Sequence, residues 1–249
     1  MKLPRVRPPR FALAPGALDG RVAQISGNEL HHMRDVMRLR PGAEVRLIAD
    51  DGAEVAGRIS RFETDHAVVE ITGILKRRPP RATIILAAAI IKGPRMDFLV
   101  EKAAELGATS LWPLECARAV VRNPGTERLA RWRRLALAAA KQSLAAREME
   151  IRPPIAVAEA AREVPKETFA VVCTEGAEPL SAVIRRVRPR AMLIACGPEG
   201  DFDSAEYAAM EAAGFVPAGL GPNRLRSETA ALAALCIAAG ALDEIDRGI

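Results

Sequence analysis

The stretch "LIACGPEGDFDSAE", residues 193–206, decides the fold of the larger part of this chain. An apolar run ends in Gly-Pro-Glu-Gly-Asp, and a polar helix start follows it. Gly197 permits a close approach or an unusual φ, and the proline after it stiffens the loop. Asp203 or Ser204 can cap the next helix, with Glu206 completing a capping box. The pattern predicts a strand, a tight loop and a helix, with either an ordinary turn or a ligand-binding loop at the strand tip.

A second stretch, "AGLGPNRLRSETAALAAL" at residues 218–235, repeats this order of elements. An apolar run reaches Gly219, and a polar bend with two arginines and Glu228 precedes an Ala/Leu-rich helix. Neither loop has the spacing of a dinucleotide or P-loop phosphate site. Two such loops at neighbouring strand tips predict a pocket for a planar, uncharged group such as adenine. Ordinary turns, with helix caps at Ser227 and Thr229 and a surface ion-pair cluster in the second loop, are the alternative interpretation.

From residue 82 onward, strand patterns alternate with helix patterns. Expected strands are "ATIILAAAI" (82–90), "TSLWPL" (109–114), "TFAVVC" (168–173), "AMLIAC" (191–196) and "FVPAGL" (215–220). Expected helices include residues 95–107, residues 126–143 and a buried last helix from about Glu228. This alternation predicts an α/β domain with a mostly parallel sheet, helices on both faces and ligands at the carboxyl ends of the strands.

The first 75 residues are rich in short β patterns instead. The exception is "GNELHHMRDVMRL", residues 27–39, where Leu30, Met33, Val36 and Met37 predict the apolar face of a helix. A turn is expected at 50–52, and the charged, proline-rich "KRRPPR" reads as a linker. The predicted domains are therefore 1–75 and 82–249, with a linker at 76–81, and the chain as a whole is α+β.

Composition narrows the classes of function. The chain has 249 residues, 49% of them apolar, and its net charge is +5. Residues 1–40 hold eight Lys and Arg against three Asp and Glu, so the basic excess lies in this segment. Such a local excess is typical of a polyanion-binding surface, although a solvated basic face with no ligand has the same composition.

Membrane, metal and export signals are weak. No apolar run reaches the length of a membrane span, and no apolar segment of a leader follows the basic N-terminus, so a cytoplasmic protein is expected. The four cysteines have no metal-binding spacing and are expected to pack as small apolar side chains, and the three histidines predict no metal site.

Four ordered motifs carry a family resemblance: "HHMRDVMRLRPGAEV" (31–45), "KGPRMDFLVEKAAELGA" (92–108), "GPEG" (197–200) and "LGPNRLRSETA" (220–230). Together they resemble the bacterial 16S ribosomal RNA (uracil-N3) methyltransferases of the SPOUT class. The resemblance runs from "RPPRFAL" to the C-terminus. It implies a PUA-like β-barrel that binds RNA, followed by a methyltransferase domain with a C-terminal trefoil knot. It also implies a homodimer whose active site is near the subunit interface.

The resemblance further implies S-adenosylmethionine as cofactor and the small-subunit ribosomal RNA as partner. Cofactor contacts are expected at Gly197, Glu199, Gly200, Leu220, Gly221, Leu225 and Arg226. Four positions depart from the family pattern: Asp201 stands where a glycine is usual, Asn223 and Arg224 replace an arginine and a β-branched residue, and Ala145 stands where an arginine is usual. These departures bear on fine details of substrate contact.

The expected reaction is methylation of N3 of a specific uridine, for which the base must leave its stack and lose a proton. Arg226 is the candidate that stabilises the resulting anion, with Glu228 orienting it or accepting a proton. RNA phosphate contacts are expected at Arg7, Arg10, Arg34, Arg38, Arg40, Lys92 and Arg95. Alternatives are a SPOUT enzyme acting on a ribose 2′-hydroxyl or another base, and an RNA-binding assembly factor without catalysis.

Overall fold

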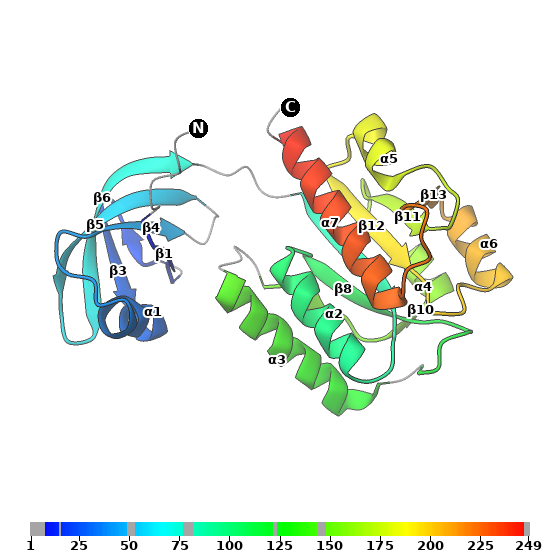
Figure 1. The fold of residues 1–249 in the computed structure, drawn as a ribbon, viewed down its shortest axis with the longest axis horizontal. Helices are drawn as coiled ribbons and strands as arrows, with labels where there is room; N and C mark the ends of the chain where they lie inside the picture. The colour runs from blue at the N-terminus through cyan, green and yellow to red at the C-terminus, as the bar shows by residue number, and fades with distance from the viewer. Residues whose placement is uncertain are drawn as a thin grey trace. The chain divides into compact units, whose positions relative to one another are not determined.

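A computed structural model gives the fold as two compact units, Met1–Pro80 and Arg81–Ile249 (Figure 1). The structure describes residues 8–14, 16–48, 53–76, 82–121, 124–143 and 148–246. The predicted turn at 50–52, Arg7 and most of the predicted linker lie outside these ranges. The predicted domain limits at residues 75 and 82 stay predictions.

The first unit is a barrel-like, six-stranded sheet in the order β1-β4-β5-β6-β3-β2. Its strands are β1 (Arg10–Ala12), β2 (Leu18–Asp19), β3 (Val22–Ser26), β4 (Glu44–Ile48), β5 (Glu54–Phe62) and β6 (His66–Lys76). All pairs are antiparallel except β1 with β4. Every second residue of β3 and of β4 faces inward, and these side chains pack around the buried Phe11 and Ile59. The alternation of buried and exposed residues along these strands therefore gives the sheet one face in the core and one face in solvent.

The predicted helix at 27–39 is shorter than expected and changes its period. It consists of α1 (Gly27–His31) followed by a π-helical turn, η1 (His32–Val36). Leu30 and Met33 are buried as predicted, whereas Val36 and Met37 are 58% and 42% exposed. The prediction for these last two residues was wrong, because the wider π turn rotates them off the apolar face that a 3.6-residue period assumes.

The second unit contains a seven-stranded sheet in which every recorded pairing is parallel. The order is β10-β8-β7-β12-β11-β13, with β9 also paired to β8. The strands are β7 (Thr83–Ala89), β8 (Ser110–Glu115), β9 (Glu150–Ile151), β10 (Ile155–Ala156), β11 (Phe169–Cys173), β12 (Ala191–Cys196) and β13 (Val216–Ala218). The predicted parallel sheet is confirmed, and β12 lies at its centre between β7 and β11.

Helices cover both faces of this sheet, as predicted (Figure 1). One face packs against α2 (Pro94–Glu105), α3 (Gly125–Ser143), α5 (Leu180–Val187) and α7 (Ser227–Asp246). The other packs against α4 (Val157–Arg162) and α6 (Ser204–Ala212). The apolar run at residues 84–89 of β7 follows from this, because a strand buried on both faces has no solvent side.

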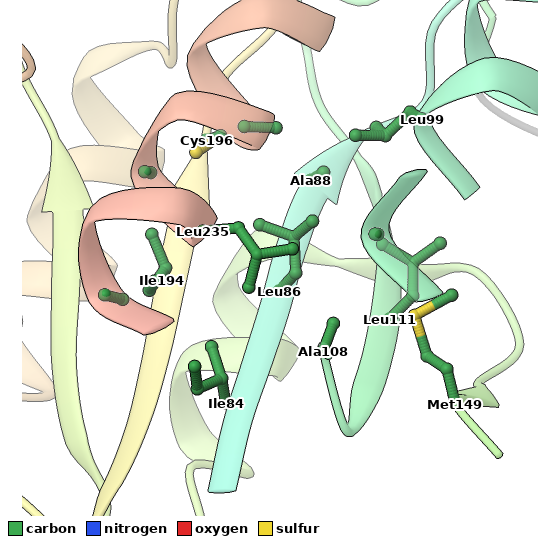
Figure 2. Close-up of a cluster of buried hydrophobic side chains, with 14 of the residues drawn as sticks. Ile84, Leu86, Ala88, Leu99, Ala108, Leu111, Met149, Ile194, Cys196 and Leu235 are labelled. Atoms are coloured by element: carbon green, nitrogen blue, oxygen red, sulfur yellow. The ribbon is translucent and has the colours of Figure 1, made fainter. Parts of the chain in front are cut away.

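Successive side chains along a strand of this sheet pack alternately into the cores on its two faces, one of which lies under α7. Figure 2 shows Leu86 of β7 facing Leu235 of α7, with Ile194 of β12 beside them. All three side chains are at most 1% exposed. Ile85 of β7 faces the opposite core. Within the described residues, no helix combines the length and the apolar character that a membrane span requires.

Candidate functional site

A pocket lies at the carboxyl ends of β11, β12 and β13, where a parallel sheet is expected to bind its ligand. Three segments that follow these strands line it. The lining residues are Cys173, Thr174, Glu175, Cys196, Gly197, Pro198, Glu199, Asp201, Leu220, Gly221, Asn223, Arg224, Leu225, Ser227 and Ala230. The two glycine-proline loops therefore form walls of one cavity, as predicted, but their strands β12 and β13 are not neighbours, because β11 lies between them.

Most of the predicted cofactor residues are brought together here. Gly197, Glu199, Leu220, Gly221 and Leu225 line the pocket, whereas Gly200 and Arg226 are next to lining residues and do not line it themselves. Contact of any of them with a cofactor stays a prediction. The sequence interpretation missed Thr174 and Glu175. Their signal was available, because they follow the predicted strand at 168–173 directly, as the other two loops follow theirs.

The Gly-Pro-Glu-Gly-Asp loop is a tight turn closed by a hydrogen bond between its own backbone groups. The Asp201 N–H donates to the Pro198 carbonyl at 2.9 Å. A Cβ on Gly197 would come within 3.2 Å of the Phe202 ring, so a larger residue does not fit there without a shift.

Asp201, the departure from the family pattern, has a φ of 62°, in the left-handed region that favours glycine. Aspartate is among the few residues that tolerate this region, because its short side chain bonds locally. Its Oδ1 accepts hydrogen bonds from the Phe202 N–H at 2.8 Å and from the Tyr207 hydroxyl at 2.9 Å. Burial, and then the bond to Asp201, raise the pKa of Tyr207, which keeps this hydroxyl a donor. Asp201 thus replaces glycine without opening the turn.

The predicted capping box is confirmed at the start of α6. Asp203 Oδ1 accepts from the Glu206 N–H, and Glu206 Oε2 accepts from the Asp203 N–H, both at 2.8 Å. The box satisfies two backbone donors that the first turn of a helix leaves without partners. It fixes the exit of the chain from the pocket loop.

Charged groups from three segments meet beside the pocket. Nη1 of Arg95, at the start of α2, lies 2.9 Å from Oε1 of Glu199 and 3.5 Å from Oε2 of Glu228. Arg95 was predicted to bind RNA phosphate, yet it joins the predicted cofactor residue to the predicted catalytic carboxylate. Glu228 is 9% exposed, and its carboxylate pairs with this guanidinium. The ion pairs tie together α2, the Gly-Pro-Glu-Gly loop and α7.

The start of α7 presents one buried hydroxyl to the pocket. Ser227 is 8% exposed, and among the described residues its Oγ has no hydrogen-bond partner. Its interpretation as a helix cap is therefore wrong. A buried hydroxyl without a partner is costly unless a ligand or water satisfies it, which makes it a candidate ligand contact.

Arg226 lies between Leu225 and Ser227 and is exposed. Its carbonyl accepts from the Ala230 N–H at 2.8 Å, and the described part of the chain shows no partner for its guanidinium. Arg224 and Asn223 are also exposed and line the pocket. The bend thus offers positive charge at the pocket's edge.

The cysteines only partly follow expectation. Cys116 and Cys196 are buried, whereas Cys236, on α7, is exposed, so the prediction of core packing was wrong for it. Cys173 and Cys196 line the pocket, with their sulfur atoms 3.5 Å apart. The contact with Cys173, together with burial, raises the pKa of Cys196 well above its usual value, so Cys196 is a neutral, polarisable thiol.

The predicted RNA contacts of the first unit divide into two kinds. Arg10 lies 3.0 Å from the carboxylate of Glu54, which is 7% exposed, and Arg34 bonds to Asp35 at 3.3 Å. Arg38 and Arg40 are exposed, and no partner is recorded for either side chain within the described ranges. In the second unit, Lys92 is also exposed. Arg38, Arg40 and Lys92 therefore fit phosphate binding better than Arg10 does.

Comparison with known proteins defines the class. Residues 77–239 match an RNA methyltransferase domain, and residues 25–72 match an RNA methyltransferase PUA domain. The ribosomal RNA small subunit methyltransferase E of Mycobacterium bovis is 32% identical over 87% of this chain and 85% of its own. That of Bacillus subtilis is 29% identical over 85% of this chain and 87% of its own. The class is thus a PUA-containing RNA methyltransferase, and the chain belongs to the ribosomal RNA small subunit methyltransferase E family.

Solved structures agree with this assignment. A ribosomal RNA small subunit methyltransferase E from Neisseria gonorrhoeae, bound to S-adenosylmethionine, has a TM-score of 0.69 at 31% identity, over 92% of this chain and 95% of its own. A methyltransferase from Legionella pneumophila with the same bound cofactor has a TM-score of 0.66 at 28% identity, over 95% and 98%. The two-unit fold is therefore that of the family.

Proposed function

We propose that this protein transfers a methyl group from S-adenosylmethionine to N3 of a specific uridine in 16S ribosomal RNA. The observation that carries the proposal is the pocket between the "GPEGD" and "LGPNRLRSETA" loops, at the carboxyl ends of β12 and β13, which flank β11 in the parallel sheet. Relatives of the same family are small-subunit ribosomal RNA methyltransferases, and two similar structures bind S-adenosylmethionine. The assignment of N3 of uridine as the methylated atom rests on the resemblance of the sequence motifs to the (uracil-N3) methyltransferases.

The residues of the pocket fit the cofactor. Glycines and small side chains leave room for a planar base against backbone groups, and the buried Ser227 hydroxyl lacks a partner that a ligand can supply. Glu175 and Glu199, which line the pocket, complement the positive charge of a sulfonium or an ammonium group. When bound, S-adenosylmethionine supplies an electrophilic methyl group.

The protein's own residues then have two tasks. The pocket walls hold the donor in line with the acceptor nitrogen, because displacement at carbon depends on alignment. Arg226 lies at the edge of the pocket, where its positive charge stabilises the uracil anion that forms when N3 loses its proton. Glu228, two positions further along the chain and held by Arg95, orients the bend.

Further properties of the family extend the proposal. The protein acts in the cytoplasm as a homodimer, and its chain forms a trefoil knot near the C-terminus. Phe98 and Val120, apolar side chains that are 49% and 82% exposed, are candidates for the dimer surface. Sedimentation of the purified protein tests the dimer.

The test of function is a transfer assay. The protein is incubated with isotopically labelled S-adenosylmethionine and small ribosomal subunits, and the labelled nucleoside is mapped. We expect label on N3 of one uridine. Label on a ribose oxygen or another base would favour a different SPOUT activity. Binding of RNA with neither cofactor binding nor transfer would favour an assembly factor and contradict the proposal.

RNA binding by the first unit gives a separate prediction. We expect the double substitution Arg38→Ala and Arg40→Ala to weaken RNA binding at every sequence, because phosphate contacts carry no base information. The slope of log affinity against log salt should fall by about one for each phosphate that the variant no longer binds. Filter binding over a salt series measures it.

Arg61→Ala is the matched control, since Arg61 is on the same unit but is bonded to Glu63 at 2.6 Å. An unaltered salt slope in the double variant would place the RNA surface elsewhere.

A further inference from the structure

A segment that does not line the pocket is hydrogen-bonded to the Gly-Pro-Glu-Gly-Asp loop and to the residue after it. Residues 116–118 follow β8, and Nη1 of Arg118 donates to the Gly200 carbonyl at 3.0 Å and to the Phe202 carbonyl at 3.3 Å. These hydrogen bonds join residues that are 82 and 84 positions apart. No local pattern in the sequence indicates them.

Two other contacts bring the same segment to the same loop. The Ala117 N–H donates to Glu206 Oε1 at 2.8 Å, while the other oxygen of that carboxylate closes the capping box of α6. Cys116 packs in the core cluster that contains Phe202. The segment after β8 therefore bonds to two carbonyls of the loop region and to the capping box of α6, and it shares a core cluster with Phe202.

The fit is close at Gly200. A Cβ on this glycine would lie 3.3 Å from the Cβ of Arg118, closer than an ordinary van der Waals contact, so a larger residue at position 200 would require a small shift of the segment after β8. Arg118 itself is exposed and does not line the pocket. Any effect that it has on a ligand must therefore pass through the loop.

We propose that Arg118 is a positioning residue for cofactor binding, which fixes residues 200–202 by bonding to their carbonyls from outside the pocket. This inference rests on the proposed function. A guanidinium suits the task, because its several N–H groups lie in one plane and one of them reaches two carbonyls here. Without these hydrogen bonds the free loop is less ordered. Cofactor binding must then order the loop, and the conformational entropy lost in this step weakens the affinity for the cofactor.

The experiment measures S-adenosylmethionine binding by calorimetry in the full-length protein. We expect Arg118→Ala to raise Kd about tenfold, and to raise KM for the cofactor more than it lowers kcat. Amide hydrogen exchange should accelerate at residues 200–203 and remain unchanged in β7. Arg118→Lys, which keeps a cationic donor, should restore part of the affinity.

Two variants complete the design. Arg131→Ala is the matched control, because it also removes an exposed arginine. Arg131 pairs with Asp97 at 3.0 Å on the other face of the sheet, so the Kd of this variant for S-adenosylmethionine should remain within about twofold of wild type. Arg118→Met keeps the aliphatic packing without any donor, so it decides the question if the alanine variant does not fold.

The outcomes are distinct. Wild-type Kd and wild-type exchange at residues 200–203 in Arg118→Met, or in a folded Arg118→Ala, would overturn the inference while leaving the proposed function intact. If the wild-type protein binds no S-adenosylmethionine, the proposed function is wrong, and the exchange experiment still decides whether Arg118 orders the loop. A fall in thermal stability with unchanged Kd would assign Arg118 to folding alone and also overturn it.

Discussion

Replacing Arg226 with alanine is expected to reduce methyl transfer by about two to three orders of magnitude, the cost of removing one preorganised charge-stabilising group from an active site. The acceptor nitrogen of uracil must lose a proton, and the negative charge spreads onto the neighbouring oxygens. Arg226 is exposed at the edge of the pocket, and no described residue neutralises its guanidinium. Its charge is therefore available to the anion, whereas that of Arg95 is taken up by two carboxylates.

Single-turnover transfer with saturating cofactor measures this effect, and calorimetry measures cofactor binding separately. We expect the Arg226→Ala variant to fold normally, because the side chain is exposed and makes no recorded packing contact. Arg226→Lys should recover part of the rate, since it keeps the charge but changes the donor geometry. Arg134→Ala, an exposed arginine on α3, is the control for a general loss of charge. Turnover equal to wild type in Arg226→Ala would remove this residue from the mechanism.

The second domain could be predicted from sequence wherever local pattern and tertiary packing agree. The apolar runs of β7 and β12, for example, indicate burial on both faces, and burial on both faces is what a central parallel strand requires. The capping box of Asp203 and Glu206 is equally local, with both partners within one helical turn. These features need no knowledge of the rest of the chain.

Features set by distant residues were not predictable in this way. Arg95 looked like an available cation in sequence, but the fold brings Glu199 and Glu228 to it from more than 100 positions away. The π turn at 32–36 breaks the period on which the burial of Val36 and Met37 was predicted. Likewise, the contact of Arg118 with Gly200 exists only once β8 and β12 lie in one sheet. Sequence patterns thus locate the pocket loops but not the groups that hold them.

The second pocket loop provides the other large prediction, because its first glycine has no room for a side chain. A Cβ on Gly219 would lie 2.5 Å from the carbonyl oxygen of Ala177, a backbone atom. The chain cannot move away freely, since the Gly219 N–H donates to the Glu178 carbonyl at 2.7 Å and its own carbonyl accepts from the Leu180 N–H at 2.9 Å. Gly219→Ala must therefore break these bonds or displace the start of α5.

We expect Gly219→Ala to lower the free energy of unfolding by about 3 kcal/mol, the upper range for overpacking. It should also weaken S-adenosylmethionine binding, because Leu220 and Gly221 follow directly and line the pocket. Urea unfolding and calorimetry measure the two effects. Gly240→Ala in α7 is the matched control: nothing lies within 4 Å of its added Cβ, and alanine favours a helix, so stability should rise by about 0.5–1 kcal/mol. Equal unfolding midpoints for the two variants would show that the backbone around Gly219 yields to the added methyl group, and the pocket wall would then not be rigid at this point.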